Sequence, residues 1–117
     1  MSDVVIYHNP RCSKSRQALA LVEEAGVTPS VVKYLDTPPS AEELDAILKK
    51  LGMEPQQLMR TGEDRYKELG LGAKTLSREE AIAVMVANPV LIERPIVIKG
   101  DKAVVARPPE RAQELLG

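Results

Sequence analysis

The sequence predicts an α/β fold in which a β-α-β unit comes first, an all-helical insertion follows, and a β-β-α unit ends the chain. Three observations support this prediction. Short apolar runs rich in β-branched residues stand near both ends of the chain. Two helix-capping patterns stand in the middle, where such runs are missing. A turn signal separates the last two runs, as in a β-hairpin. Together these features predict a mixed four-stranded sheet interrupted by helices.

The β-α-β unit occupies roughly the first third of the chain. The run "DVVIY", Asp3–Tyr7, is typical of a strand buried on both faces. Asn9-Pro10 ends it. From about Ser13 to Ala25 the apolar residues recur at helical spacing, and "PSVVKYL", Pro29–Leu35, predicts a second strand. A right-handed crossover would make these two strands parallel.

The middle of the chain, roughly Asp36 to Leu91, predicts helices only. Ser40 with Glu43 and Ser77 with Glu80 have the spacing of capping boxes, and helically spaced apolar residues follow each pair. A further short helix is expected near residues 64–69. We therefore interpret this stretch as an insertion into the sheet domain.

Strands return after the insertion. Ile96–Ile98 and Ala103–Val105 flank a Lys-Gly-Asp-Lys turn, and Pro108-Pro109 open a last short helix, Glu110–Leu116. The complete order is that of a thioredoxin-like sandwich. We expect one domain over residues 1–117, with the helical insertion at about 36–91.

Composition narrows the possible functions. The net charge of −1 gives no reason to expect nucleic acid or an anionic membrane as partner. No apolar run approaches the roughly 18 residues of a spanning helix, and the first residues do not resemble a signal peptide, so we expect a cytoplasmic protein. A single cysteine excludes an internal disulfide and any cysteine-rich metal site.

The stretch "YHNPRCSKSR" holds both the only cysteine, Cys12, and the only histidine, His8. Cys12 is predicted to lie where the first helix begins. The partial positive charge and free N–H groups of a helix N-terminus stabilise a thiolate and also bind tetrahedral anions. Nearby in sequence stand charged and hydroxyl side chains that would reinforce both effects: Arg11, Lys14, Arg16, Ser13 and Ser15. The loop therefore offers a nucleophile and an oxyanion site together.

Other interpretations of these two residues exist. A lone cysteine is usually a small buried apolar residue, but its position at a strand-to-helix turn favours a reactive thiol. His8 could be structural, could tune Cys12 electrostatically, or could orient the loop. One His and one Cys cannot supply the ligands typical of zinc. Ser15 stands where a dithiol oxidoreductase has its second cysteine.

Three further arginines attract attention by their context. Arg60 lies in "MRTG", Arg94 precedes Pro95 at the start of the third strand, and Arg107 precedes Pro108 after the fourth. In a thioredoxin-like sandwich the residues before the third strand lie beside the first helix's N-terminus, and the X-Pro bond there is often cis. We therefore predict a cis Arg94–Pro95 bond. The guanidinium group suits a tetrahedral oxyanion. Local sequence alone does not reveal whether the three arginines converge.

Four motifs together resemble a known family. "YHNPRCSKSR", "RTGE", "LIERPIVI" and "ARPPE" are similar, in order and spacing, to the glutaredoxin-dependent arsenate reductases of the ArsC family, along essentially the whole chain. The resemblance implies that Cys12 is the nucleophile and that His8 tunes the thiol. It also implies that Arg60, Arg94 and Arg107 bind the arsenate and arsenite groups. We therefore predict that the three arginines converge on the Cys12 sulfur.

The resemblance implies a reaction as well. The Cys12 thiolate attacks arsenate, glutathione adds as co-substrate, arsenic(V) becomes arsenic(III), glutaredoxin resolves the mixed disulfide, and arsenite leaves. No bound cofactor or metal is implied, and we expect a monomer. This chain departs from familiar members in having Ser13 where they have glycine, an additional charge at Arg11, and a short C-terminus.

Two alternatives share this fold. Spx-like transcriptional regulators bind RNA polymerase, but they typically carry a C-x-x-C redox switch that Cys12 and Ser15 cannot form. A glutathione-dependent thiol reductase would have no need of three arginines around its sulfur.

Overall fold

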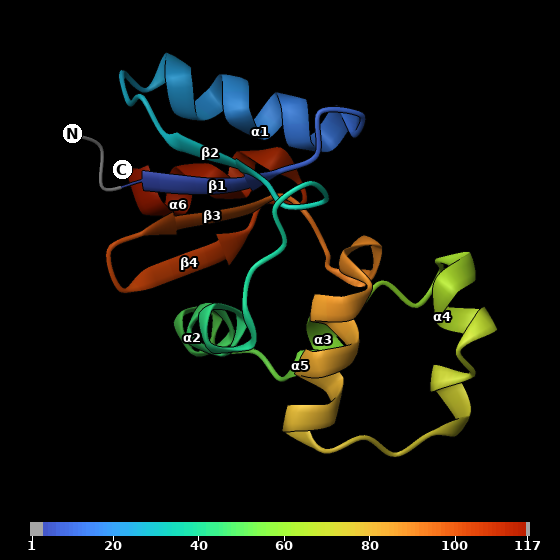
Figure 1. Ribbon diagram of the computed structural model, residues 1–117. Helices are drawn as coiled ribbons and strands as arrows, with labels where there is room; N and C mark the ends of the chain where they lie inside the picture. The colour runs from blue at the N-terminus through green and yellow to red at the C-terminus, as the bar shows by residue number, and fades with distance from the viewer. Residues whose placement is uncertain (1–3, 117) are drawn as a thin grey trace. The chain divides into compact units, whose positions relative to one another are not determined.

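The computed structural model describes residues 4–116, and the chain forms two compact units (Figure 1). The first unit comprises the chain up to Thr37 and again from Arg94. The second is Pro38–Glu93, close to the predicted insertion at about 36–91. Asp3, the first residue of the first predicted strand, lies outside the described residues. The assignment of the whole chain to one domain stays a prediction.

The first unit is built on the predicted mixed four-stranded sheet, with order β2-β1-β3-β4. Its strands are β1 (Val4–His8), β2 (Ser30–Lys33), β3 (Ile96–Lys99) and β4 (Lys102–Val105). β1 is parallel to β2 and antiparallel to β3, and β3 and β4 form an antiparallel hairpin. β2 is shorter than predicted, because the chain turns immediately after Lys33.

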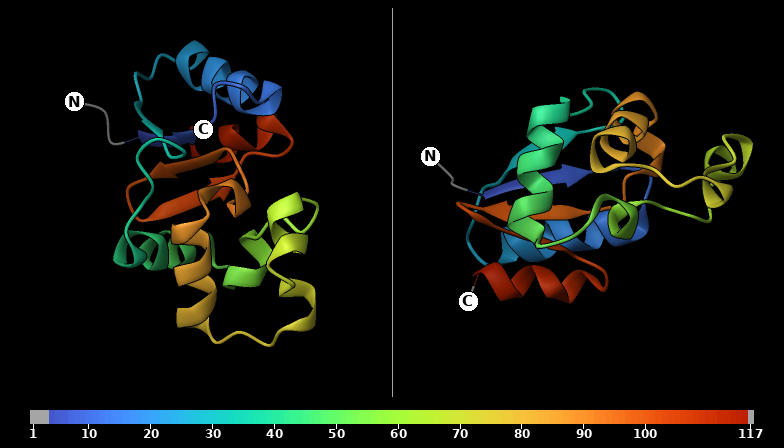
Figure 2. Two further views of the ribbon diagram at one scale, coloured as in Figure 1. Left: turned by 45° about the vertical axis from the view of Figure 1, so that its right-hand side comes forward. Right: turned by 90° about the horizontal axis from the view of Figure 1, so that it is seen from below.

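Helices cover one face of this sheet. α1 (Ser13–Glu24) and the C-terminal pair η3 (Pro109–Ala112) and α6 (Gln113–Leu116) lie on the same side of the strands (Figure 2). The predicted last helix therefore opens with a 3-10 turn. The aliphatic core between the helices and the sheet consists of Val4, Ile6, Ala18, Val22, Val97, Val104, Ala106 and Ala112. Burial of this apolar surface is the main stabilising contribution to the unit.

The second unit is helical among its described residues, apart from one isolated bridge. Its elements are α2 (Ala41–Leu51), α3 (Pro55–Leu58), α4 (Asp64–Glu68), η1 (Leu71–Ala73), α5 (Arg78–Ala87) and η2 (Pro89–Leu91). Both predicted capping boxes are confirmed: in each, the serine Oγ accepts from the glutamate N–H and the glutamate carboxylate accepts from the serine N–H.

Besides the two 3-10 turns η1 and η2, sequence patterns missed two features of the second unit. One is the single-turn helix α3, which lacks an apolar period of its own. The other is an antiparallel bridge between Met59 and Ile92, extended by a bond from the Arg60 N–H to the Leu91 carbonyl (2.7 Å). This bridge joins two segments far apart in the chain and fixes the backbone at Arg60. Within residues 4–116, no helix is both long and apolar enough to cross a bilayer.

The core predicts how substitutions affect stability. Ile6 is fully buried, whereas its neighbour across the β1–β2 ladder, Val31, is 43% exposed. We expect Ile6→Ala to lower the free energy of unfolding by about 2–5 kcal/mol, because a cavity replaces core contacts. Val31→Ala is the matched control and should cost no more than about 1 kcal/mol. Urea unfolding followed by circular dichroism measures both, and equal losses would contradict this account of the core.

Candidate functional site

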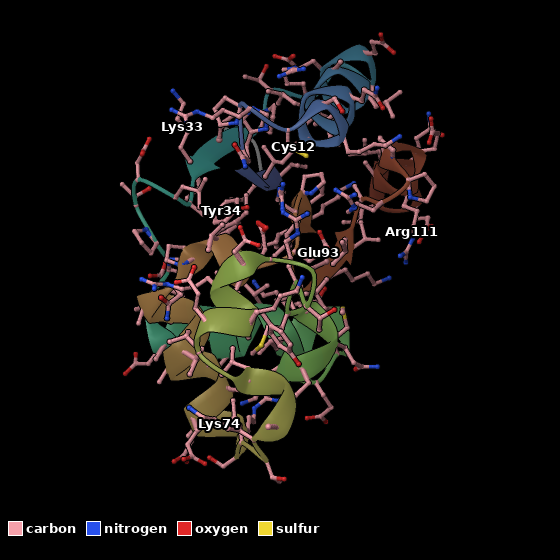
Figure 3. The ribbon with its side chains drawn as sticks, turned by 90° about the vertical axis from the view of Figure 1, so that its right-hand side faces the viewer. Cys12, Lys33, Tyr34, Lys74, Glu93 and Arg111 are labelled. Carbon is pink, nitrogen blue, oxygen red and sulfur yellow. The ribbon has the colours of Figure 1, made fainter. Side chains whose placement is uncertain are left out.

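Cys12 lies at the start of α1, as predicted, and its thiol is free and half-buried (Figure 3). It is the residue that caps the helix N-terminus, with extended backbone angles (φ −95°, ψ 123°), and its side chain makes no capping hydrogen bond. A turn positions it, because the Cys12 N–H donates to the Asn9 carbonyl over 3.0 Å. The Cys12 side chain therefore does not occupy the first N–H groups of α1.

The structure brings Arg107 to this thiol. Its Nη1 lies 3.9 Å from the Cys12 Sγ, although 95 positions separate the two residues. The same nitrogen donates to the Arg94 carbonyl over 3.3 Å, which holds the guanidinium in place. Both arginines are half-buried. A cation is thus held within contact distance of the sulfur.

Sheet pairing explains why Arg94 and Arg107 are neighbours. Arg94 precedes β3 and Arg107 follows β4, and antiparallel pairing of these strands brings those ends together. A bond from the Ala106 N–H to the Pro95 carbonyl (2.9 Å) extends the pairing. The Arg94–Pro95 bond is cis, as predicted, and so is Arg107–Pro108, which was not predicted. The Arg94 backbone is therefore part of this arrangement, while convergence of its guanidinium on Cys12 stays a prediction.

His8 is buried and bonds to Ser15. Its Nδ1 lies 2.7 Å from the Ser15 Oγ, and that oxygen also accepts from the Asn9 N–H over 3.0 Å. Ser15 is itself completely buried. Two bonds to one oxygen thus join the end of β1 to the first turn of α1, and they close the loop that carries Cys12. Of the interpretations left open for His8, this contact favours orientation of the loop.

The environment of His8 also disfavours its charged form. Burial is the main reason that its pKa lies below the ordinary value, and the positive charges of Lys33 and Arg16 lower the pKa further. The imidazole is therefore neutral near pH 7. A charged His8 is accordingly not the source of positive potential at this site.

Arg16 and Arg11 both contribute to the loop's shape. The Arg16 Nη1 donates to the Pro10 carbonyl over 2.9 Å. The Arg11 N–H donates to the Asn9 Oδ1 over 3.0 Å, while the Arg11 side chain is exposed. These bonds hold the loop from both ends. The Ser15 hydroxyl bonds to His8 and Asn9, and the Arg16 guanidinium bonds to Pro10. Substrate binding by these two side chains stays a prediction.

Arg60 belongs to the second unit, and its convergence on Cys12 stays a prediction. Its guanidinium lies between two carboxylates, with Nη1 3.3 Å from Glu63 and Nε 3.4 Å from Glu93. The first pair is local, because Arg60 and Glu63 lie in one turn in which the Glu63 N–H donates to the Arg60 carbonyl over 3.3 Å. Nothing in the local sequence signals the second, because the Met59–Ile92 bridge creates it. Within residues 4–116, no three His, Cys, Asp or Glu side chains are grouped to hold a metal ion.

The environment of His8 predicts a pH dependence. The folded protein takes up the His8 proton at lower pH than the unfolded chain does, so the free energy of unfolding should fall as pH drops below about 6.5. NMR titration of the only imidazole should give a pKa below the ordinary value, and Lys33→Ala should raise it. A folded-state pKa at or above that of a model histidine would contradict the buried, neutral assignment.

The Arg107 contact predicts a change in thiol reactivity. Arg107→Ala removes the cation beside the sulfur, so alkylation of Cys12 by iodoacetamide at pH 7 should slow roughly three- to tenfold. Arg111→Ala is the control, because Arg111 is exposed and pairs with Glu114 at 3.3 Å. The time course of alkylation, followed by mass spectrometry, measures both variants. Equal rates for the two would exclude an effect of Arg107 on the thiol.

Comparison with known proteins identifies the family. The family model described as "ArsC family" matches residues 7–115. The Escherichia coli (strain K12) protein YfgD, described as uncharacterized, is 55% identical over 97% of both chains. An arsenate reductase of Neisseria meningitidis (strain MC58) is 48% identical over 99% of this chain and 100% of its own.

A solved structure agrees with these matches. The structure titled arsenate reductase from Vibrio cholerae superimposes with a TM-score of 0.92 at 51% identity, covering 96% of each chain. Its similarity extends over the sheet, the helices and the segment of the insertion. With the family model and the full-length relatives, it shows that this chain belongs to the ArsC family.

Proposed function

We propose that this protein is an arsenate reductase that uses Cys12 as its nucleophile and glutathione as its source of thiol. The observation that carries the proposal is the Arg107 guanidinium, held 3.9 Å from the Cys12 sulfur at a helix N-terminus. A fixed cation beside a thiol stabilises the thiolate and also attracts an incoming oxyanion. Several relatives are named arsenate reductases, which supports arsenate as that oxyanion.

In the first step the Cys12 thiolate attacks arsenic(V) of arsenate. A sulfur–arsenic bond forms, one arsenate oxygen leaves as water after protonation, and no electron changes hands. Arg107 stabilises the negative charge of the arsenate oxygens, together with Arg94 and Arg60. The free N–H groups of the first turn of α1 supply further donors. Ser15 and Arg16 keep the loop in the shape that presents the sulfur.

The second step must supply two electrons, and the chain has only one thiol. A thiolate of glutathione attacks the Cys12 sulfur and breaks the sulfur–arsenic bond. The bonding pair stays on arsenic, which leaves as arsenite, arsenic(III), while the two sulfurs are oxidised to a disulfide. A glutaredoxin thiol then exchanges with this mixed disulfide and restores Cys12. We expect the reaction to take place in a reducing, glutathione-containing cytoplasm.

His8 is a positioning residue in this proposal. A neutral imidazole bonded to Ser15 keeps the carboxyl end of β1 against the first turn of α1, so that Cys12 points toward Arg107. The Arg60 guanidinium is already oriented by its ion pairs with Glu63 and Glu93 before arsenate binds. Orientation before substrate arrives lowers the entropy cost of assembling the charged groups around arsenate.

The electron donor distinguishes this proposal from its alternatives. We expect arsenate-dependent NADPH consumption with glutathione, glutaredoxin and glutathione reductase, and none with thioredoxin and thioredoxin reductase without glutathione. Cys12→Ser should abolish the activity. Thioredoxin-supported turnover would contradict the electron path. Glutathione-dependent reduction of disulfides with no response to arsenate would indicate the thiol-reductase alternative.

The arginines give a second prediction. Arg107→Lys keeps a positive charge but loses the planar fork, so kcat/KM for arsenate should fall about tenfold or more. The same direction is expected for Arg94→Lys, whereas Arg111→Lys should leave kcat/KM unchanged. Circular dichroism verifies that each variant folds. Wild-type kcat/KM in Arg107→Lys would exclude a role for its guanidinium geometry.

A further inference from the structure

A second feature of the first unit is a cavity of about 230 Å³ at the carboxyl ends of β1 and β2. The loop of residues 8–11 forms one wall, and Lys33, Leu35 and Asp36 form the other. Arg11, in the first wall, immediately precedes Cys12, and consecutive Cα atoms lie about 3.8 Å apart. The cavity therefore extends to the residue that precedes Cys12 in the chain, although Cys12 itself does not line it.

Hydrogen bonds fix both walls. In one, the Asp36 N–H and the Thr37 N–H both donate to the Lys33 carbonyl, over 2.9 Å and 3.0 Å. In the other, Asn9 accepts from Arg11 and Cys12, and Pro10 accepts from Arg16. The cavity is thus formed by ordered turns.

Strand pairing determines which charges meet here. The parallel register pairs His8 with Lys33, so the ammonium-bearing strand end lies beside the loop that leads to Cys12. Arg11, Lys33 and Asp36 are exposed, and within residues 4–116 none of the three takes part in an ion pair. The cavity therefore presents two cations and one carboxylate that are not neutralised by partners.

We propose that this cavity binds the free α-amino-acid end of the external thiol, which is the γ-glutamyl end of glutathione. The inference rests on the proposed function, because it concerns the thiol that attacks Cys12. An α-carboxylate matches Lys33 and Arg11, and an α-ammonium matches Asp36. Whole-ligand sites usually measure about 300–1,000 Å³, so this smaller cavity suits one end of the tripeptide. The cysteinyl part then extends past Arg11 toward the Cys12 sulfur.

Binding is measured with S-methylglutathione, which cannot form a disulfide and needs no arsenate. In NMR titrations of the wild-type protein, the largest amide shifts should map to residues 8–11 and 33–36. Lys33→Ala and Asp36→Asn should each weaken binding about tenfold, the loss expected for one charge-assisted contact. Lys102→Ala, an exposed lysine on β4, is the control and should bind as the wild type does.

Turnover gives an independent measurement. Lys33→Ala and Asp36→Asn should raise the KM for glutathione about tenfold and leave the KM for arsenate unchanged. γ-Glutamylcysteine should replace glutathione, whereas cysteinylglycine, which lacks the γ-glutamyl end, should not. Equal use of the two dipeptides would overturn the assignment.

The two readouts separate this inference from the proposed function. Shifts that map elsewhere, or equal binding by Lys33→Ala and Lys102→Ala, would overturn the cavity assignment even if arsenate is reduced normally. Shifts confined to the cavity walls and lost in Lys33→Ala would support it even if arsenate turnover fails, and the proposed function alone would then be wrong.

Discussion

The contact between the Arg107 guanidinium and the Cys12 sulfur spans 95 positions, and the first unit's architecture holds its two ends together. Cys12 follows β1, and Arg107 follows β4. β3 lies between these strands and is antiparallel to both, so the carboxyl ends of β1 and β4 meet at one edge of the sheet. The aliphatic core beneath α1 and α6 then fixes α1 against the strands. A polar contact of 3.9 Å is thus maintained by apolar packing.

At this end of the sheet, one basic side chain is charged and another is neutral. Arg107 carries a permanent positive charge and lies against the thiol, whereas burial and nearby cations keep His8 neutral. Neutral His8 bonds to Ser15 and holds the loop in place. Its contribution to the site is therefore the conformation of the loop, not positive charge. Because guanidinium does not lose its proton in proteins, the positive potential at Cys12 depends little on pH. Family membership and this geometry together support the chemistry proposed for the site.

Local rules explain what the sequence could predict. Both capping boxes depend on residues three apart, and the turn at Asn9-Pro10 places Cys12 at a helix start, so short-range patterns sufficed. The hairpin signal similarly predicted β3 and β4. Order and spacing of the β-branched runs were enough for the fold class, and the motifs were enough for the family.

Short-range patterns could not predict contacts between segments that are far apart in the chain. Glu93 reaches Arg60 only because a bridge between Met59 and Ile92 forms, and Lys33 reaches His8 only through the parallel register. Each depends on how far-apart residues pair, and no local pattern encodes that pairing. The cavity between residues 8–11 and the segment after β2 was missed for the same reason.

The most direct measurement of the central claim is intact-protein mass spectrometry of a reaction stalled by omitting glutaredoxin. With arsenate and glutathione present, the account predicts one glutathione adduct per chain, located on Cys12 by peptide mapping, together with one equivalent of arsenite. Without arsenate the adduct should be far less abundant. Release of arsenite without any adduct on Cys12, or from the Cys12→Ser variant, would contradict the account.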